Sequence, residues 1–281
     1  MVERCAEARA RRGDPLPASA PPVARWLLIE QPGPWGADPW RDSRLPASVV
    51  ASVAAQAAAA RVRVLLIRRP GRAVPGPRRW ALVNSRPGVE GSWWSEFTDP
   101  DELMDLRLDA DRGAPSRAPV YLVCAHARHD ACCALLGRPL AAALAVERPE
   151  ATWECTHVGG DRFAGNLVVL PHGLYYGQVA PERGLDIATR YEQGHLELPL
   201  LRGRSVFSAP VQAAQQFVRE DAGETGIDSF PPLSVREVED QLWEVALAGA
   251  LIRVRAVNRR SDTPLTCSAP APGLFRYFVR A

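Results

Sequence analysis

The chain has 281 residues, of which 47% are apolar and 23% charged, so it is long enough for one sizeable or two modest cores, and disorder throughout is excluded. All 34 basic residues are arginines and stand against 32 acidic ones. The formal net charge of +2 gives no indication of nucleic-acid binding, and we expect no nucleic-acid partner.

The N-terminal segment carries no targeting or membrane signal. Residues 1–23 are rich in Arg, Pro and Ala without periodicity, which predicts a disordered tail. Residues 1–14 are charged and lack the apolar stretch of a secretory signal. The Ala-rich run 46–60 is bounded by arginines and is too short to span a bilayer. We therefore expect a cytoplasmic protein with no membrane partner.

Residues 24–115 are predicted to form a first structural unit. An apolar run at 25–30 ends in Pro and Gly and reads as a buried strand. An Ala-rich helix and three further strands complete a β-α-β-β-β unit; the predicted ranges are 46–60 for the helix and 62–68, 79–84 and 92–97 for the strands.

Residues 116–200 repeat the same order of elements. Strands are predicted at 119–123, 152–155, 166–170 and 174–177, and helices at 139–148 and 181–193. Pro139 suits the first turn of its helix, and Pro149 ends it. The order is that of a thioredoxin-like unit. The predicted fold class is therefore α/β, with two thioredoxin-like (ferredoxin-type) β-α-β-β units followed by a small α+β C-terminal module.

That C-terminal module is predicted over residues 205–281. It comprises a helix, a linker, a hairpin that turns at Gly249 and a last strand; the ranges are 209–221, 223–232, 241–248 with 250–258, and 275–279. Cys267 is its one residue with recognisable chemistry, and we interpret it as a core residue.

Six cysteines, four of them between positions 124 and 155, stand out in the sequence; they are Cys5, Cys124, Cys132, Cys133, Cys155 and Cys267. In a reducing compartment such clustering indicates metal binding or redox chemistry rather than a disulfide framework. Cys124 ends one predicted strand and Cys155 another, and His157 follows two residues later. Thiolates and imidazoles that leave neighbouring strand ends suit iron–sulfur or zinc.

Several motifs resemble the sucrase/ferredoxin-like family, which is related to thioredoxin-like [2Fe-2S] ferredoxins. The matching segments are Trp26-Leu-Leu-Ile-Glu-Gln-Pro-Gly-Pro-Trp-Gly36, the Cys-x8-Cys of Cys124 and Cys133, His157-Val-Gly-Gly-Asp-Arg-Phe-Ala164 and Leu170-Pro-His-Gly-Leu-Tyr-Tyr-Gly177. The resemblance covers roughly residues 24–200, with a weaker match at Leu265-Thr-Cys267. It implies a [2Fe-2S] cluster with mixed Cys and His ligands.

The resemblance also implies which residues bind the cluster. Family members with an established cluster have Cys-x8-Cys followed by His-x-Gly-Gly-His, which matches Cys124, Cys133 and His157, whereas Asp161 takes the place of the second His. Carboxylate is a harder ligand than imidazole. Either Asp161 completes the site, or Cys155 or Cys132 substitutes, or the cluster is weak or absent. Asp161 is favoured by position and Cys155 by chemistry, because Cys155 lies on the same face of a strand as His157.

The leading hypothesis is an electron carrier that serves an unidentified reductase or acceptor protein, rather than a catalyst. A thiol-based redox protein without a cluster and a zinc-stabilised or metal-free binding module are the alternatives. Glycosidase activity needs a pair of facing carboxylates, and no spacing singles one out. The stretch 24–115 has no Cys or His and is interpreted as structural or as a docking surface.

Other residues near the motifs are given accessory roles. His126 and His129 either hydrogen-bond the cluster sulfurs or lie exposed in the loop. Arg162 either raises the reduction potential or pairs with a carboxylate, the second being the commoner role. His172 and His195 are interpreted as structural or surface residues.

Overall fold

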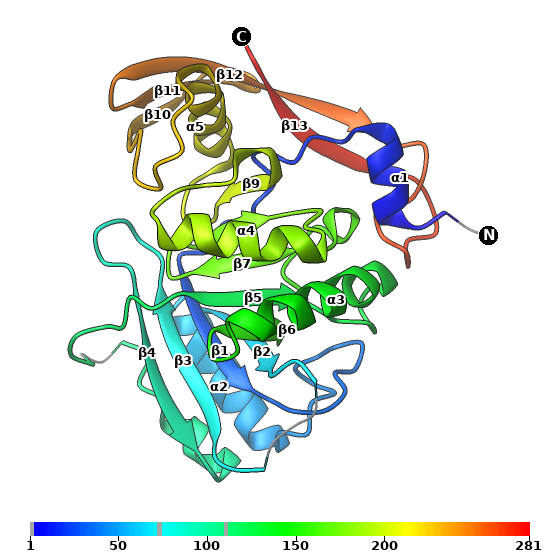
Figure 1. Ribbon diagram of the computed structural model, residues 1–281, viewed down its shortest axis with the longest axis vertical. Helices are drawn as coiled ribbons and strands as arrows, with labels where there is room; N and C mark the ends of the chain where they lie inside the picture. Colours follow the sequence, from blue (N-terminus) through cyan, green and yellow to red (C-terminus); the bar gives the residue numbers. More distant parts are fainter. Residues whose placement is uncertain (1–2, 72–74, 110–111) are drawn as a thin grey trace.

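Two β-sheets organise residues 3–71, 75–109 and 112–281, the part of the chain that the computed structural model describes (Figure 1). The larger is a curled sheet of nine strands in the order β4-β3-β1-β2-β6-β5-β7-β8-β9. The smaller has four strands in the order β10-β11-β12-β13. The architecture is thus mixed α/β with a second, smaller sheet, as the sequence predicts.

The strands of the larger sheet are β1 (Arg25–Glu30), β2 (Arg63–Arg68), β3 (Arg78–Asn84), β4 (Gly91–Phe97), β5 (Val120–Cys124), β6 (Thr152–Cys155), β7 (Leu167–Leu170), β8 (Leu174–Tyr176) and β9 (Leu201–Arg204). Those of the smaller sheet are β10 (Pro232–Glu239), β11 (Leu242–Leu247), β12 (Ala250–Arg260) and β13 (Leu274–Arg280). The α-helices are α1 (Cys5–Arg12), α2 (Ala47–Ala59), α3 (Ala131–Glu147), α4 (Pro181–Glu192) and α5 (Ala209–Ala222). Three short 3-10 helices are η1 (Pro100–Asp105), η2 (Asp161–Phe163) and η3 (Leu198–Leu200).

The larger sheet contains the same pairing pattern twice. β1 pairs parallel with β2 and antiparallel with β3, which pairs with β4. β5 likewise pairs parallel with β6 and antiparallel with β7, which pairs with β8. The two halves join through an antiparallel contact between β2 and β6, where Ile67 lies opposite Cys155 and Arg68 opposite Glu154. The repeated order of elements in the sequence therefore corresponds to a repeated pattern of strand pairing.

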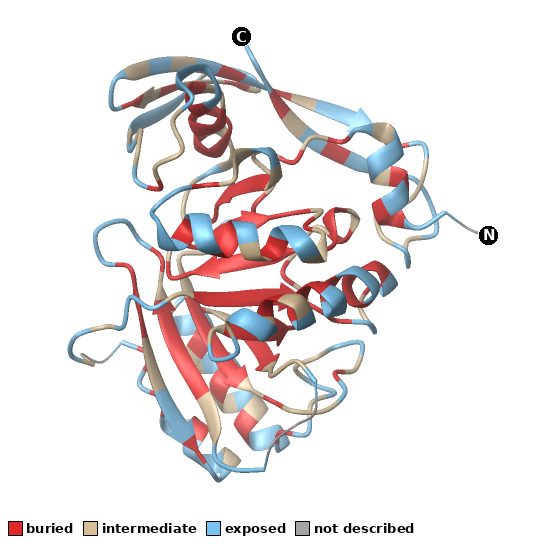
Figure 2. Ribbon diagram, in the orientation of Figure 1, coloured by how far each residue is buried: buried red, intermediate tan, exposed pale blue. Residues whose placement is uncertain are grey.

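Successive residues of the central strands pack into different cores. Trp26 of β1 and Leu122 of β5 lie in one core that both halves share, together with Cys124, whereas Leu27 packs against α2 in a second core. Tyr121 packs with residues of α3 and α4 in a third. The central strands are buried on both faces, as Figure 2 shows, and this explains their continuous apolar runs.

The prediction of a disordered tail over residues 1–23 is wrong for its described part. Residues 5–12 form α1, whose Cys5 and Ala8 are buried, and Arg12 makes a buried ion pair of 2.7 Å with Asp14. Small apolar side chains among arginines give weak periodicity, so the buried face of α1 escapes composition-based reasoning. Residues 1–2 lie outside the described part.

Helix α3 begins at Ala131, whereas the sequence predicts a start at Pro139. Asp130 caps it, because Oδ1 of Asp130 accepts a hydrogen bond of 2.8 Å from the backbone N–H of Cys132. Pro139 lies inside the helix. The hydrogen bond to Asp130 stabilises a helix start ahead of the proline. This earlier start places Cys133 in the first turn of the helix.

The C-terminal part contains the expected helix and hairpin, with α5 packed on the smaller sheet. Two strands were not predicted: β9, which extends the larger sheet, and β10, which extends the smaller one. The β12–β13 hairpin reaches across to α1 (Figure 1), and Cys267, predicted to be a core residue, is exposed in its connecting loop. None of the helices in the described residues combines the length and the apolar character that a membrane span requires.

Candidate metal centre

Two strand ends and one helix start bring together three of the residues that the sequence predicts. β5 and β6 are parallel neighbours, with Cys124 opposite Cys155 at their carboxyl ends. Cys124 ends β5, Cys133 lies in the first turn of α3, and His157 follows β6. The two sulfurs and a ring nitrogen of His157 all lie within 4.8 Å of one another. The residues thus form a compact group of soft and borderline donors.

Asp161 joins this group as a fourth polar side chain. Its Oδ1 lies 3.0 Å from Nδ1 of His157 and accepts a hydrogen bond of 3.3 Å from the thiol of Cys133. The carboxylate is buried at the start of η2. Asp161 therefore occupies a place from which it reaches both a thiol and the imidazole.

His129 is a further member of the site. Its ring stacks on that of His157 with centroids 3.7 Å apart, and its Nε2 lies 3.5 Å from Oδ2 of Asp161. From the sequence, His129 is expected either to hydrogen-bond the cluster sulfurs or to lie exposed in the loop. In the structure, His129 contacts Oδ2 of Asp161 and covers one face of the His157 ring.

The charges of these groups support one another. Burial opposes protonation of His157, but its hydrogen bonds to Asp161 and Cys124 raise its pKa to about 9. Burial alone would raise the pKa of Asp161, yet hydrogen bonds from His129 and His157 hold it well below its usual range. Without a metal, His157 and Asp161 therefore form an ion pair at neutral pH.

The two thiols of the group differ in acidity. The hydrogen bond from Cys133 lowers the pKa of Cys124 in spite of burial, and His157 lowers it further. The same hydrogen bond, together with burial, raises the pKa of Cys133. Cys124 is thus the thiol that is prepared as a thiolate, the form that binds metals.

The other candidate ligands lie apart from this group. Cys155 is fully buried in the shared core, where burial raises its pKa, and it is not among the donors that converge with His157. Cys132 points to a different set of residues that includes Cys5. Of the residues considered for the fourth position, Asp161 is the one that the fold places beside His157.

Two accessory residues also have partners of their own. His126 is buried, and its Nε2 lies 2.7 Å from the carbonyl oxygen of Gly36. Arg162 lies 3.4 Å from Asp14, so it pairs with a carboxylate, the commoner of the two roles considered for it.

The His157–Asp161 loop depends on two glycines and a buried arginine. Gly159 and Gly160 have φ of +99° and +84°, values that favour glycine. A Cβ on Gly160 would lie 2.5 Å from Nη2 of Arg202. Arg202 is buried and donates to the carbonyl oxygen of Gly159 at 2.9 Å and to Oδ1 of Asn166 at 2.6 Å. Burial lowers its pKa to about 10.

Sequence reasoning missed Arg202. It belongs to β9, beyond the predicted end of the second unit, and no motif marks it. The N-terminal segment contributes as well, because the backbone carbonyl of Ser19 accepts a hydrogen bond of 2.6 Å from Arg202. The loop that carries two candidate ligands is therefore held by the segment before the first strand and by the last strand of the larger sheet.

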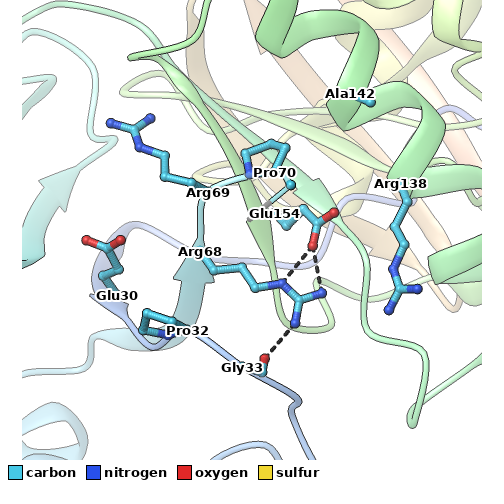
Figure 3. A pocket seen from close by; sticks show the side chains of 10 residues that line it. Glu30, Pro32, Gly33, Arg68, Arg69, Pro70, Arg138, Ala142 and Glu154 are labelled. Atoms are coloured by element: carbon cyan, nitrogen blue, oxygen red, sulfur yellow. Dashed lines mark hydrogen bonds and ion pairs between the residues drawn. The ribbon is translucent and has the colours of Figure 1, made fainter. Parts of the chain in front are cut away.

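A cavity of about 540 Å³ opens away from this group, at the ends of β1 and β2 (Figure 3). Its charged lining includes Glu30, Arg68, Arg138 and Glu154, but no Cys or His. Arg68 donates to Glu154 at 2.7 Å and to the carbonyl of Gly33 at 2.6 Å, as the dashed lines in Figure 3 show. The cavity contains no thiol or imidazole, and none of the residues of the candidate centre lines it.

The family model described as sucrase/ferredoxin-like matches residues 16–203. This range includes Cys124, Cys133, His157 and Asp161, and it excludes Cys5 and Cys267. Comparisons with curated proteins and with solved structures give no match.

Proposed function

Because the chain belongs to the sucrase/ferredoxin-like family, we propose that it is a [2Fe-2S] ferredoxin-like electron carrier. Its cluster ligands are Cys124, Cys133, His157 and Asp161. The observation that carries this proposal is the convergence of two thiols, an imidazole and a carboxylate at the ends of β5 and β6. The thioredoxin-like interpretation of each half is part of the proposal, and the repeated pairing of strands supports it.

The donor set fits such a group. Thiolates are the usual ligands of iron–sulfur clusters, and imidazole replaces them in some. Carboxylate is the unusual member, but the low pKa of Asp161 keeps it ionised, and its Oδ1 already lies beside His157 and Cys133. When bound, the cluster would supply one-electron transfer at a potential above that of an all-Cys cluster.

The exposure of the ligands indicates where electrons would enter and leave. Cys124, Cys133 and Asp161 are buried, whereas the side chain of His157 is 20% exposed and that of His129 is 38% exposed. The two stacked imidazoles therefore form the solvent-facing side of the centre. A reductase or acceptor protein would approach there, and the first half of the sheet would serve as structure or as part of the docking surface. We place the carrier in the cytoplasm, where thiols stay reduced.

The thiol-based alternative has less support. A catalytic thiol must reach its substrate, and both Cys124 and Cys133 are fully buried.

A single zinc ion is the second candidate occupant. The donors of Cys124, Cys133 and His157 lie within 4.8 Å of one another, a spacing that suits one tetrahedral ion directly. In that case the chain would be a zinc-stabilised binding module.

Iron, acid-labile sulfide and zinc contents of anaerobically purified protein test the proposal, together with its visible spectrum. We expect iron and sulfide in equal amounts, as a [2Fe-2S] cluster requires. Asp161→Ala should lose the cluster or bleach rapidly, whereas Asp161→His, which supplies the family's usual ligand, should retain it. Cys155→Ala is the matched control and should keep full iron content.

Other results would overturn the assignment. Zinc without sulfide would establish the binding module instead. Bleaching of Cys155→Ala with no effect of Asp161→Ala would identify Cys155, and not Asp161, as the fourth ligand. Protein that stays free of iron after reconstitution with iron and sulfide would exclude the carrier.

A further inference from the structure

A second group of metal-binding side chains lies beside the first, and the proposed carrier function does not use it. It consists of Cys5 in α1, Asp130 and Cys132 at the start of α3, and Cys267 in the loop between β12 and β13. One ligand atom from each of the four lies within 4.8 Å of every other. Two of the cysteines, Cys5 and Cys267, lie outside the range that matches the family.

The sulfur separations suit a common metal ion. Sγ of Cys267 lies 3.5 Å from Sγ of Cys132 and 3.5 Å from Sγ of Cys5. A tetrahedral zinc ion with Zn–S bonds of about 2.3 Å separates its sulfurs by roughly 3.8 Å. A disulfide would need a distance of about 2.05 Å. The three thiols are therefore arranged around a point and are not bonded in pairs.

Asp130 completes the arrangement. Its Oδ2 lies 3.6 Å from Sγ of Cys5 and accepts a hydrogen bond of 2.6 Å from the backbone N–H of Cys267. Its Oδ1 accepts from the backbone N–H of Cys132 at 2.8 Å. One carboxylate thus orients two of the cysteines and faces the third, and each oxygen has a further lone pair for a cation.

The surroundings bring these segments together without help from the cysteines. Arg11 of α1 makes an ion pair of 2.8 Å with Asp262, which lies in the same loop as Cys267. Cys5, Asp130 and Cys132 are buried, whereas Cys267 is exposed. The four ligand atoms are therefore already close together, and one of the ligands lies at the surface, from which an ion can reach the others.

We propose that Cys5, Cys132, Cys267 and Asp130 form a structural zinc site that is distinct from the cluster site. Zinc binding displaces the thiol protons to solvent and changes no oxidation state. Three thiolates and one carboxylate supply the four ligands of a tetrahedral ion. The site joins α1, the start of α3 and the C-terminal hairpin loop, and its existence does not depend on the proposed carrier function.

Cobalt(II) titration of the metal-free full chain tests this site, because cobalt–thiolate bonds absorb light. Cys124→Ser with His157→Gln removes donors of the first centre and provides the background variant. We expect that variant to bind one equivalent of cobalt with sulfur-to-metal charge-transfer absorption. Loss of outer-shell contacts alone weakens metal sites about 10–100-fold, so adding Cys267→Ser should weaken binding more than about 100-fold.

Controls separate loss of a ligand from loss of the fold. Cys267 is exposed, so Cys267→Ser should keep the circular dichroism spectrum of the parent, and Ser268→Ala should leave cobalt affinity unchanged. If the background variant shows no thiolate absorption with cobalt, or if Cys267→Ser binds as tightly as its parent, the zinc site is excluded. A disulfide between two of the three cysteines in protein purified anaerobically would also overturn it.

The iron–sulfur cluster and the zinc site are tested by different measurements, so either proposal can fail without the other. Iron and sulfide content should be unchanged in Cys267→Ser, since that residue is not a ligand of the cluster. Cobalt binding by the background variant stands whether or not the natural protein holds a cluster.

Discussion

The two halves of the nine-stranded sheet pair their strands alike but carry different residues at their strand ends. In the second half, Cys124 ends β5, and the segment after β6 carries His157 and Asp161. In the first half, the corresponding loops follow β1 and β2, and residues 24–115 contain neither Cys nor His. The first half instead places Arg68 beside a cavity. In each half, two parallel strands thus bring the loops at their carboxyl ends together. Only the loops of the second half carry side chains of the kind that bind a metal.

The first half still supports the centre. Nη2 of Arg63 in β2 donates to the backbone carbonyl of His157 at 3.0 Å, and the carbonyl of Gly36 meets His126. The half-buried Arg63 of the first half therefore contacts the start of the His157–Asp161 loop. The buried Arg202 of β9, at the edge of the larger sheet, hydrogen-bonds the middle of that loop. The comparison therefore predicts unequal effects of similar substitutions in the two places.

The largest effect is expected from Arg202→Met, compared with Arg63→Met. Loss of Arg202 leaves the buried Oδ1 of Asn166 and the partly buried carbonyls of Gly159 and Ser19 without these donors, and should lower the free energy of unfolding by about 4 kcal/mol. Arg63 is half-buried, and its loss should cost about 1 kcal/mol. Urea unfolding of metal-free protein measures both. Equal costs would contradict the unequal roles of the two arginines.

In metal-free protein, the raised pKa of His157 should make stability fall with rising pH. The pKa of His157 is about 9 in the folded state, against about 6.5 when unfolded, so its contribution to stability is fully present below pH 6.5 and is lost as pH rises through about 9. The loss amounts to about 3 kcal/mol. Urea midpoints measured from pH 6 to 10 report it.

Two variants check the assignment to His157. His157→Gln should remove the part of the decline that His157 causes between pH 6.5 and 9, while His195→Gln, at an exposed position, should retain it. An unchanged decline in His157→Gln would place the titrating group elsewhere.

The smallest effect separates two glycines with nearly the same backbone conformation. Gly160 follows β6 with φ of +84°, and Gly71 follows β2 with φ of +86°. Among the described residues, a Cβ at Gly71 meets no atom within 4 Å, whereas one at Gly160 meets Arg202. We expect Gly71→Ala to cost about 1 kcal/mol, from the backbone alone, and Gly160→Ala about 2 kcal/mol, because the contact is added. Thermal or urea unfolding of the two variants measures the difference. Equal costs would show that the side chain of Arg202 moves aside without loss of stability.

Strands were the most predictable part of the fold. β1, β2 and β5 are apolar runs closed by Pro, Gly or charged residues, and the structure places them within a residue or two of the predicted ranges. The start of α3 was predicted too late, because Pro139 is a stronger visible signal than the cap at Asp130. Helix α1 was missed since its buried face consists of small residues, which give little periodicity.

The candidate centre was predictable as far as local spacing reaches. Cys124, Cys133 and His157 lie on motifs that strand ends bring together, so the sequence indicated them directly. Arg202 and the pairing of Cys5 with Cys267 depend on contacts between distant segments, which periodicity and spacing do not encode. Cys267 was misassigned as a core residue for the same reason, because its neighbours come from the other end of the chain.

The contact between β2 and β6 relates the two halves of the larger sheet. Each half offers one outer strand to the other, and the two strands run antiparallel, as a two-fold axis would require of two identical subunits. The eight strands from β4 to β8 in the sheet order are therefore arranged like those of a symmetric dimer. In a homodimer, a substitution at a strand end would appear in both copies. In a single chain, the strand ends of one half can differ from those of the other.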